Sequence, residues 1–182
     1  MNQKVNLLVR YALLFVIGLA NLLAGSALLY NIFAPLTLYP SYWLFNLLYG
    51  ARLVSATVFF FKGYYIELIP ACIAGSAYYL LLILNLTTQM GIKKRIYNLI
   101  YIIGVFLIAN ILRIFIFGIL LVNGYQYFDV AHLATWYVGS TILVILIWFS
   151  GVRIFKIKNI PVYEDIVLLI KNLRSARKNA LH

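Results

Sequence analysis

The longest apolar stretch of the chain is Ile96–Val122, IYNLIYIIGVFLIANILRIFIFGILLV, and Arg113 is its only charged residue. A membrane-spanning helix needs about 20 predominantly apolar residues, so this stretch is long enough to cross a bilayer. The whole composition agrees, because 65% of the 182 residues are hydrophobic and only 10% are charged, against roughly 25% charged in soluble domains. The sequence therefore predicts an all-α polytopic membrane protein, with residues 1–182 forming a single membrane-embedded domain.

Three further stretches are long and apolar enough to cross, near Tyr11–Phe33, Pro70–Met90 and Ala131–Val152. Together with Ile96–Val122 they make about four predicted spans. The first stretch has no small-residue cleavage pattern, so we expect a retained span and not a removed signal peptide.

Basic residues predict the orientation, because Lys and Arg accumulate on cytoplasmic loops. Of the 15 Lys and Arg residues, all but Arg52, Lys62 and Arg113 flank the ends of spans that share one side. We therefore expect a cell-membrane protein with both termini in the cytoplasm. This distribution explains the net charge of +11 without a nucleic-acid partner.

The segments between and after the spans have amphipathic patterns. In the predicted extracytoplasmic connector 34–69, Ser41–Ala56 suits a helix lying in the headgroup layer, and Val58–Ile69 suits a small hairpin around Lys62 and Gly63. In the cytoplasmic tail, residues 153–182, Val162–Asn179 predicts an amphipathic helix that anchors on the inner leaflet.

Three polar residues fall at one predicted depth. At about 1.5 Å per residue, Cys72 lies about 31 Å from the inner charge Lys93, and Arg113 lies about 27 Å from Arg95. His132 lies about 31 Å from Arg153 by the same measure. The hydrocarbon core is about 30 Å thick, so all three are expected at its outer boundary, on different helices.

Each of the three has a simpler structural explanation. Arg113 can snorkel to the surface, Cys72 can pack as a small hydrophobe, and His132 can form hydrogen bonds at a helix start. An arginine in a span nevertheless costs at least about 2.5–3.5 kcal/mol on insertion scales, which calls for a reason. All three explanations would have to hold at matching depth, so we favour a shared site.

Together the three residues predict acyl-transfer chemistry. Cys72 is the expected nucleophile, in the first turn of a helix that Pro70 opens. His132 is the expected general acid and base, and the fork of Arg113 suits an oxyanion or the thiolate. We expect Asn110 to support Arg113, or else to bond a neighbouring helix, and Asp129 to orient His132, or else to cap its helix. A lone cysteine rules out a Cys-rich metal site, and we expect neither metal nor cofactor.

At these residues the chain resembles the exosortase/archaeosortase family of multi-span cysteine transpeptidases. The resemblance rests on Cys72 in PACIAGSAYYLL, on Asn110 and Arg113 in ANILRIFIFG, and on His132 in AHLATWYVG. It covers about 70 residues, 70–139. One difference is that many members have a glycine two residues after the cysteine, whereas Ala74 stands at that position here.

The resemblance implies cleavage of C-terminal sorting signals at the outer membrane face through a Cys72 thioester. The implied partners are substrate proteins whose tail contains a short motif, a transmembrane helix and a basic cluster. A membrane lipid is the implied acceptor. Two other classes stay open, a transporter subunit and a non-catalytic scaffold. Transport is disfavoured because the predicted spans contain no acidic residue.

Overall fold

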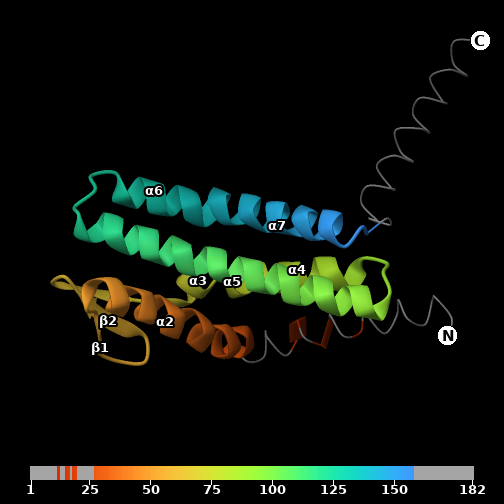
Figure 1. The fold of residues 1–182 in the computed structure, drawn as a ribbon, viewed down its shortest axis with the longest axis horizontal. Coiled ribbons are helices and arrows are strands. Elements are labelled where there is room, and N and C mark those ends of the chain that lie inside the picture. Colours follow the sequence, from red (N-terminus) through yellow and green to blue (C-terminus); the bar gives the residue numbers. More distant parts are fainter. Residues whose placement is uncertain (1–11, 13–14, 17, 20–26, 158–182) are drawn as a thin grey trace, which may run out of the picture.

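Helix α5, Ile92–Val122, runs the length of the molecule, and the other elements pack around it (Figure 1). The computed structural model describes residues 27–157, together with residues 12, 15, 16, 18 and 19. The remaining elements are α2 Ala27–Tyr49, β1 Arg52–Leu53, β2 Val58–Phe61, β3 Tyr64–Glu67, α3 Pro70–Ile73, α4 Gly75–Thr87, α6 Phe128–Ala134, η1 Thr135–Gly139 and α7 Ser140–Ile154.

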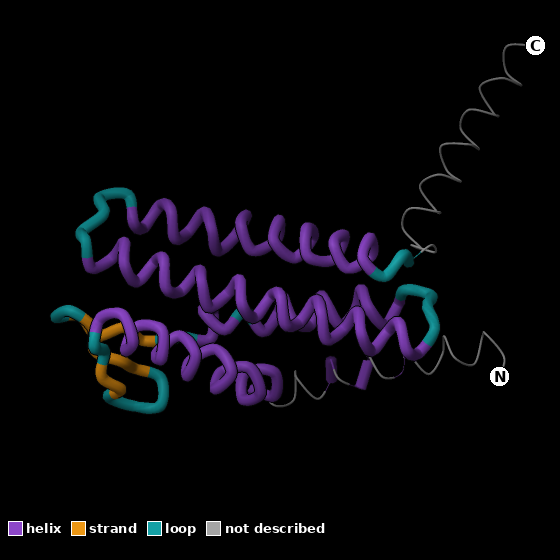
Figure 2. Tube along the Cα trace, viewed as in Figure 1, coloured by secondary structure: helices purple, strands orange, loops and turns teal. Residues whose placement is uncertain are grey.

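The structure has three helical segments long and apolar enough to cross a membrane, among the residues it describes: Pro70–Thr87, Ile92–Val122 and Phe128–Ile154. The expectation of a helical membrane protein is confirmed. The expected span Tyr11–Phe33 is described only in part, at residues 12, 15, 16, 18, 19 and 27–33, and the expected tail helix Val162–Asn179 lies wholly outside the described residues. Figure 2 shows that the small sheet and the α5–α6 connection are at one end of the bundle, and the α4–α5 connection at the other.

Helix α2 differs from the expectation, because it continues through Phe33 to Tyr49. Ser41–Ala56 is therefore not a separate amphipathic helix. Residues 41–49 belong to α2, and residues 50–56 are a connection that contains β1. Pro35 and Pro40 both lie inside α2 on its exposed side. Proline in a helix interior usually kinks or breaks the helix, yet α2 continues through both residues and beyond the expected end at Phe33.

The predicted hairpin is present, and it belongs to a three-stranded antiparallel sheet of order β1–β2–β3, so the chain is not wholly helical. Lys62 and Gly63 form its turn with φ of 44° and 88°. Two positive φ angles in a two-residue loop give the turn type that matches strand twist. Phe59 and Phe61 are buried against Phe45 of α2, which fixes the sheet on the end of the bundle.

Helices α2 and α5 each have a stripe in which every fourth residue is buried. On α2 these are Leu29, Phe33, Thr37, Ser41 and Phe45, and on α5 they are Asn98, Ile102, Phe106, Asn110, Ile114 and Gly118. Gly118 is necessary at its position, because a Cβ there would overlap the ring of Phe45. The two stripes meet at Phe45 and Gly118, whereas Asn98 and Ile102 at the start of the α5 stripe face Gly151 of α7.

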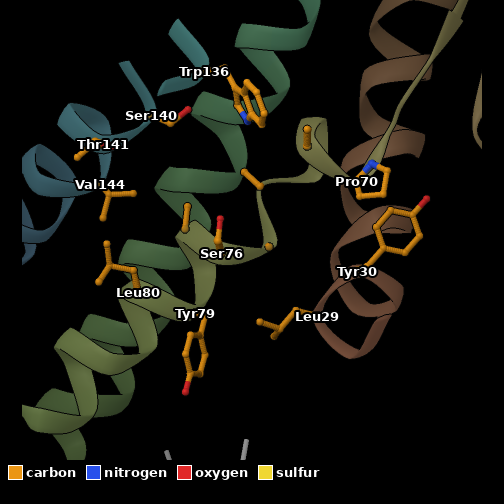
Figure 3. A pocket seen from close by; sticks show the side chains of 14 residues that line it. Leu29, Tyr30, Pro70, Ser76, Tyr79, Leu80, Trp136, Ser140, Thr141 and Val144 are labelled. Atoms are coloured by element: carbon orange, nitrogen blue, oxygen red, sulfur yellow. The ribbon is translucent and has the colours of Figure 1, made fainter. Parts of the chain in front are cut away.

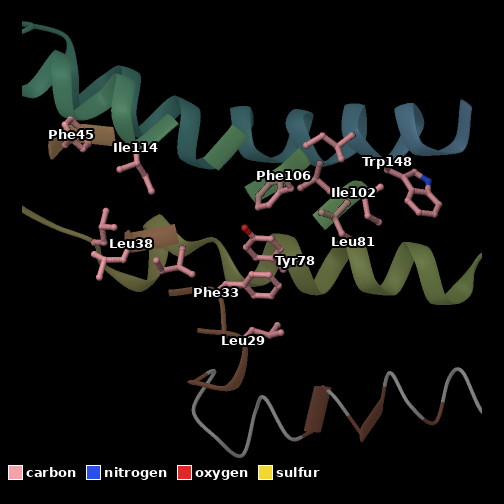
Figure 4. Close-up of a cluster of buried hydrophobic side chains, with 14 of the residues drawn as sticks. Leu29, Phe33, Leu38, Phe45, Tyr78, Leu81, Ile102, Phe106, Ile114 and Trp148 are labelled. Atoms are coloured by element: carbon pink, nitrogen blue, oxygen red, sulfur yellow. The ribbon is translucent and has the colours of Figure 1, made fainter. Parts of the chain in front are cut away.

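Between these stripes the ring of Tyr78 from α4 stacks on Phe33 at 3.6 Å between centroids and meets Phe106 edge-on at 4.9 Å (Figure 4). This aromatic layer joins three helices. It places α4, and with it the short helix α3, at a fixed height along α5.

Arg95 closes the other end of the α4–α5 pair. Its guanidinium donates to the backbone carbonyls of Leu86 and Thr88 at 2.9 Å, and also to those of Asn85 in the last turn of α4 and of Met90 in the connection to α5. The carbonyls in the last turn of a helix have no partner within the helix. Arg95 therefore supplies hydrogen-bond donors to carbonyls that would otherwise be unpaired at the end of α4.

We predict that Arg95→Ala lowers the free energy of unfolding by about 2–3 kcal/mol, because hydrogen bonds from a charged donor are worth about 1.5–3 kcal/mol. Thermal unfolding in detergent measures the change. Lys94→Ala is the matched control, since Lys94 is exposed, and it should leave the unfolding midpoint nearly unchanged. Equal effects of the two substitutions would contradict a structural role for Arg95.

Candidate active site

Cys72 lies in a helix that stops after one turn. Pro70 opens α3 as predicted, with Ile69 as the extended N-cap residue. The helix ends at Ala74, which has φ 58° and ψ 42°, and α4 starts at Gly75. The predicted continuous helix Pro70–Met90 is therefore broken two residues after Cys72. Ala74 therefore adopts a left-handed backbone conformation, which glycine adopts readily but which costs free energy for alanine.

The break leaves the carbonyl group of Cys72 available to residues of α5. In an unbroken helix the N–H four residues later, that of Ser76, would donate to this oxygen. Instead, Nδ2 of Asn110 donates to it at 2.9 Å and a terminal nitrogen of Arg113 donates to it at 3.3 Å. Asn110 and Arg113 share one face of α5, so two side chains hold the backbone beside the thiol.

The second terminal nitrogen of Arg113 donates to Oγ of Ser140 at 2.7 Å. Ser140 follows η1, a π-helical turn, and both its backbone N–H and its hydroxyl donate to the carbonyl of Thr135. A π-helical turn adds one residue to the helix and is frequent at functional sites. Here the wider turn presents Ser140 to the guanidinium, so Arg113 bridges α3 and α7.

His132 lies on α6 with an exposed side chain. Its ring stacks on Phe128 at 5.5 Å between centroids and meets Phe117 of α5 edge-on at 5.2 Å. In the described part of the chain the structure shows no hydrogen bond or ion pair between His132 and Asp129, which is also exposed. The aromatic rings orient His132, and the suggested role of Asp129 stays a prediction.

Cys72, Arg113 and His132 line one small cavity of about 20 Å³. Its other lining residues are Ala71, Phe117 and Trp136. The three residues that the sequence places at one depth thus come from α3, α5 and α6 to one place. The volume is about that of a water molecule, so a substrate needs the neighbouring space described next.

A larger cavity of about 500 Å³ adjoins the small one, since Ala71 and Trp136 line both. Figure 3 shows it between α2, with Leu29 and Tyr30, and α7, with Thr141 and Val144. Its lining is mainly apolar. A chain segment held in this cavity would lie next to the Cys72 turn.

Ser140, Phe117 and Trp136 are the site residues that sequence reasoning missed. Ser140 follows Gly139 in an apolar stretch with no charge or motif to mark it. Its role depends on a π-helical turn, which hydrophobic periodicity does not reveal. Phe117 is four residues after Arg113, so helical spacing alone was a signal that it shares the face of that arginine.

The site offers a thiol, an imidazole and a guanidinium, which together suit nucleophilic attack on a carbonyl carbon. Among the described residues, no group of three or more His, Cys, Asp or Glu side chains is placed to hold a metal ion. Comparison of the chain with protein-family models, with curated proteins and with solved structures found no match.

We predict that Ala74→Gly raises the free energy of unfolding by about 1 kcal/mol. Relief of the left-handed conformation is worth about 1–2 kcal/mol, and the greater freedom of glycine in the unfolded chain offsets about half of it. Chemical or thermal unfolding measures the change.

Ala77→Gly, within helix α4, is the matched control and should lower stability by about 0.5–1 kcal/mol. If both substitutions destabilise equally, Ala74 does not adopt the left-handed turn.

Proposed function

We propose that the chain is a membrane-embedded cysteine transpeptidase or peptidase, similar to the exosortase/archaeosortase family, with Cys72 as its nucleophile. The observation that carries the proposal is the single cavity lined by Cys72, Arg113 and His132, from three different helices. Neither a scaffold nor a transporter subunit requires a thiol, a guanidinium and an imidazole around one small cavity.

The proposed reaction begins with removal of the Cys72 proton by His132. The sulfur attacks the carbonyl carbon of the substrate peptide bond, and the negative charge that forms on the oxygen is stabilised by Arg113. The C–N bond then breaks and His132 returns a proton to the leaving amine. The product is a Cys72 thioester, which an acceptor hydroxyl or amine, or water, attacks to release the enzyme.

Arg113 suits this role because its position is fixed before the substrate arrives. Its two terminal nitrogens donate hydrogen bonds, one to the Ser140 hydroxyl and the other to the backbone carbonyl of Cys72. A group held at both ends stabilises developing charge without having to reorganise. A guanidinium directs several N–H groups in one plane, whereas an ammonium has no such fork.

The proposed orientation has the site facing the extracytoplasmic side of the cell membrane, with both termini in the cytoplasm. A substrate tail with a transmembrane helix and a cytoplasmic basic cluster would then present its outer end at the level of Cys72. The apolar cavity of about 500 Å³ beside Ala71 suits part of such a tail. A lipid acceptor would reach the thioester from the bilayer.

We predict that Cys72→Ser and Cys72→Ala abolish processing of a co-expressed substrate with a tripartite C-terminal tail. Immunoblotting of substrate size measures processing, and the same membranes show whether the variant is inserted in normal amount. Processing that continues in an inserted Cys72→Ala variant would leave only the scaffold reading.

We predict that Ser140→Ala slows processing by about 10-fold to 100-fold, because loss of one charge-assisted hydrogen bond costs about 1.5–3 kcal/mol. Ser140→Thr keeps the hydroxyl and should restore most of the rate, whereas Arg113→Lys should be as slow as Ser140→Ala or slower.

Ser150→Ala is the matched control on α7, because Ser150 contacts Tyr101 and the Ile147 carbonyl away from the site. It should process at the normal rate. A normal rate for Ser140→Ala as well would show that Ser140 does not position Arg113.

A further inference from the structure

Four buried polar atoms between α2, α4 and α5 have no hydrogen-bond partner within the described part of the chain. They are Oγ1 of Thr37, Oγ of Ser41, the phenol oxygen of Tyr78 and Oδ1 of Asn110. All four residues are at most 1% exposed. Native proteins leave few buried polar atoms unpaired, and an internal water molecule is a common explanation for a group of them.

Thr37, Tyr78 and Asn110 lie at neighbouring levels of the bundle, and Ser41 lies one helical turn beyond Thr37, toward the sheet. Phe45 covers Gly118 nearer the sheet, and Phe33 and Phe106 enclose the ring of Tyr78 on the other side. Thr37 and Asn110 each lie one helical turn after the aromatic residue of their own helix, so they occupy the layer between these two contacts. The hydroxyl of Tyr78 points away from Ile102, toward the end of the bundle where Ile114 and Phe45 lie (Figure 4).

The same layer borders the candidate site. The phenol of Tyr78 lies close to both Thr37 and Arg113. Asn110 belongs to both places, since its amide nitrogen bonds the Cys72 carbonyl while its amide oxygen is one of the four unpaired atoms. The unpaired atoms therefore lie next to the hydrogen bonds that Asn110 and Arg113 donate to the Cys72 carbonyl.

The chemistry of the four atoms identifies the ligand. The amide oxygen of Asn110 only accepts hydrogen bonds, so an anion would leave it unpaired. The nearby positive charge of Arg113 disfavours a cation. Water can donate to Asn110 and can both donate to and accept from the hydroxyls of Thr37, Ser41 and Tyr78.

We propose that Thr37, Ser41, Tyr78 and Asn110 form a buried water-binding site beside Arg113. Since a buried water molecule makes about three hydrogen bonds, these atoms can hold roughly one or two of them. The site would hydrate the inner side of an arginine that is half-buried in an apolar bundle. This inference does not depend on the proposed catalytic role of Cys72.

A structure of the full chain in lipid nanodiscs, at a resolution that shows ordered water, tests the proposal directly. We expect density within hydrogen-bonding distance of the Tyr78 oxygen and of at least one of the other three atoms. A dry layer, or a direct bond between Thr37 and Tyr78 with no density beside them, would overturn it.

The sign of the change in the unfolding midpoint also distinguishes bound water from a dry layer. Thr37→Val and Ser41→Ala each remove a hydrogen bond to bound water and should lower the unfolding midpoint by about 2–4 °C. In a dry layer they remove an unsatisfied polar group, so the midpoint would stay or rise. Ser41→Ala also distinguishes bound water from a direct hydrogen bond between Thr37 and Tyr78, because this substitution would not affect a direct bond.

Thr141→Val is the matched control for loss of a helical hydroxyl. Thr141 already bonds the carbonyl of Tyr137 on an exposed face. Its substitution should change the midpoint by less than either Thr37→Val or Ser41→Ala, and an equal change in all three would count against bound water.

Discussion

The structure depends on where a half-buried arginine obtains its hydrogen bonds. Arg113 lies among apolar helices, and the described residues place no acidic side chain against it. A charge in such surroundings must be hydrogen-bonded or hydrated, or it opposes folding by several kcal/mol. Arg113 bonds a backbone carbonyl of α3 and a hydroxyl of α7. The two neighbouring segments therefore have to deviate from regular helix where they meet it.

Both deviations serve the same contact. The turn at Ala74 ends α3 early and frees the Cys72 carbonyl, and the π-helical turn Thr135–Gly139 turns Ser140 toward α5. Each deviation carries a local cost, one in backbone conformation and one in helix regularity. The aromatic layer of Phe33, Tyr78 and Phe106 and the Arg95 contacts hold α4 in place on either side. In this way the regular helix packing stabilises the two irregular turns beside Arg113.

Three of the four predicted spans correspond to helices long and apolar enough to cross a membrane, because the hydropathy and length of a segment can be read from its sequence. The Lys62–Gly63 turn was also predicted, and Cys72, Arg113 and His132, which the helical rise places at one expected depth, line one small cavity. The sequence could not predict that α2 continues through Pro35 and Pro40, because neighbouring helices determine whether proline ends a helix.

The interior details of the site were beyond the sequence for a related reason. The break at Ala74 is not marked by a glycine at that position, and a π-helical turn has no apolar period of its own. The partner of Arg113 on α7 therefore looked like any serine in a span. For Asn110 the sequence left two roles open, support of Arg113 or a bond to a neighbouring helix. The structure shows the second, because Asn110 and Arg113 of α5 both donate to the Cys72 carbonyl of α3.

We propose that Cys72, which lines one small cavity with Arg113 and His132, forms a covalent bond with a substrate carbonyl. Intact-mass and peptide mass spectrometry of the enzyme, purified after co-expression with a protein bearing a tripartite tail, tests this claim most directly. We expect an acyl adduct on Cys72 that hydroxylamine releases, as it does a thioester, and that is absent from Cys72→Ser. Cleavage of the substrate with no adduct on Cys72, or with the adduct on another residue, would contradict it.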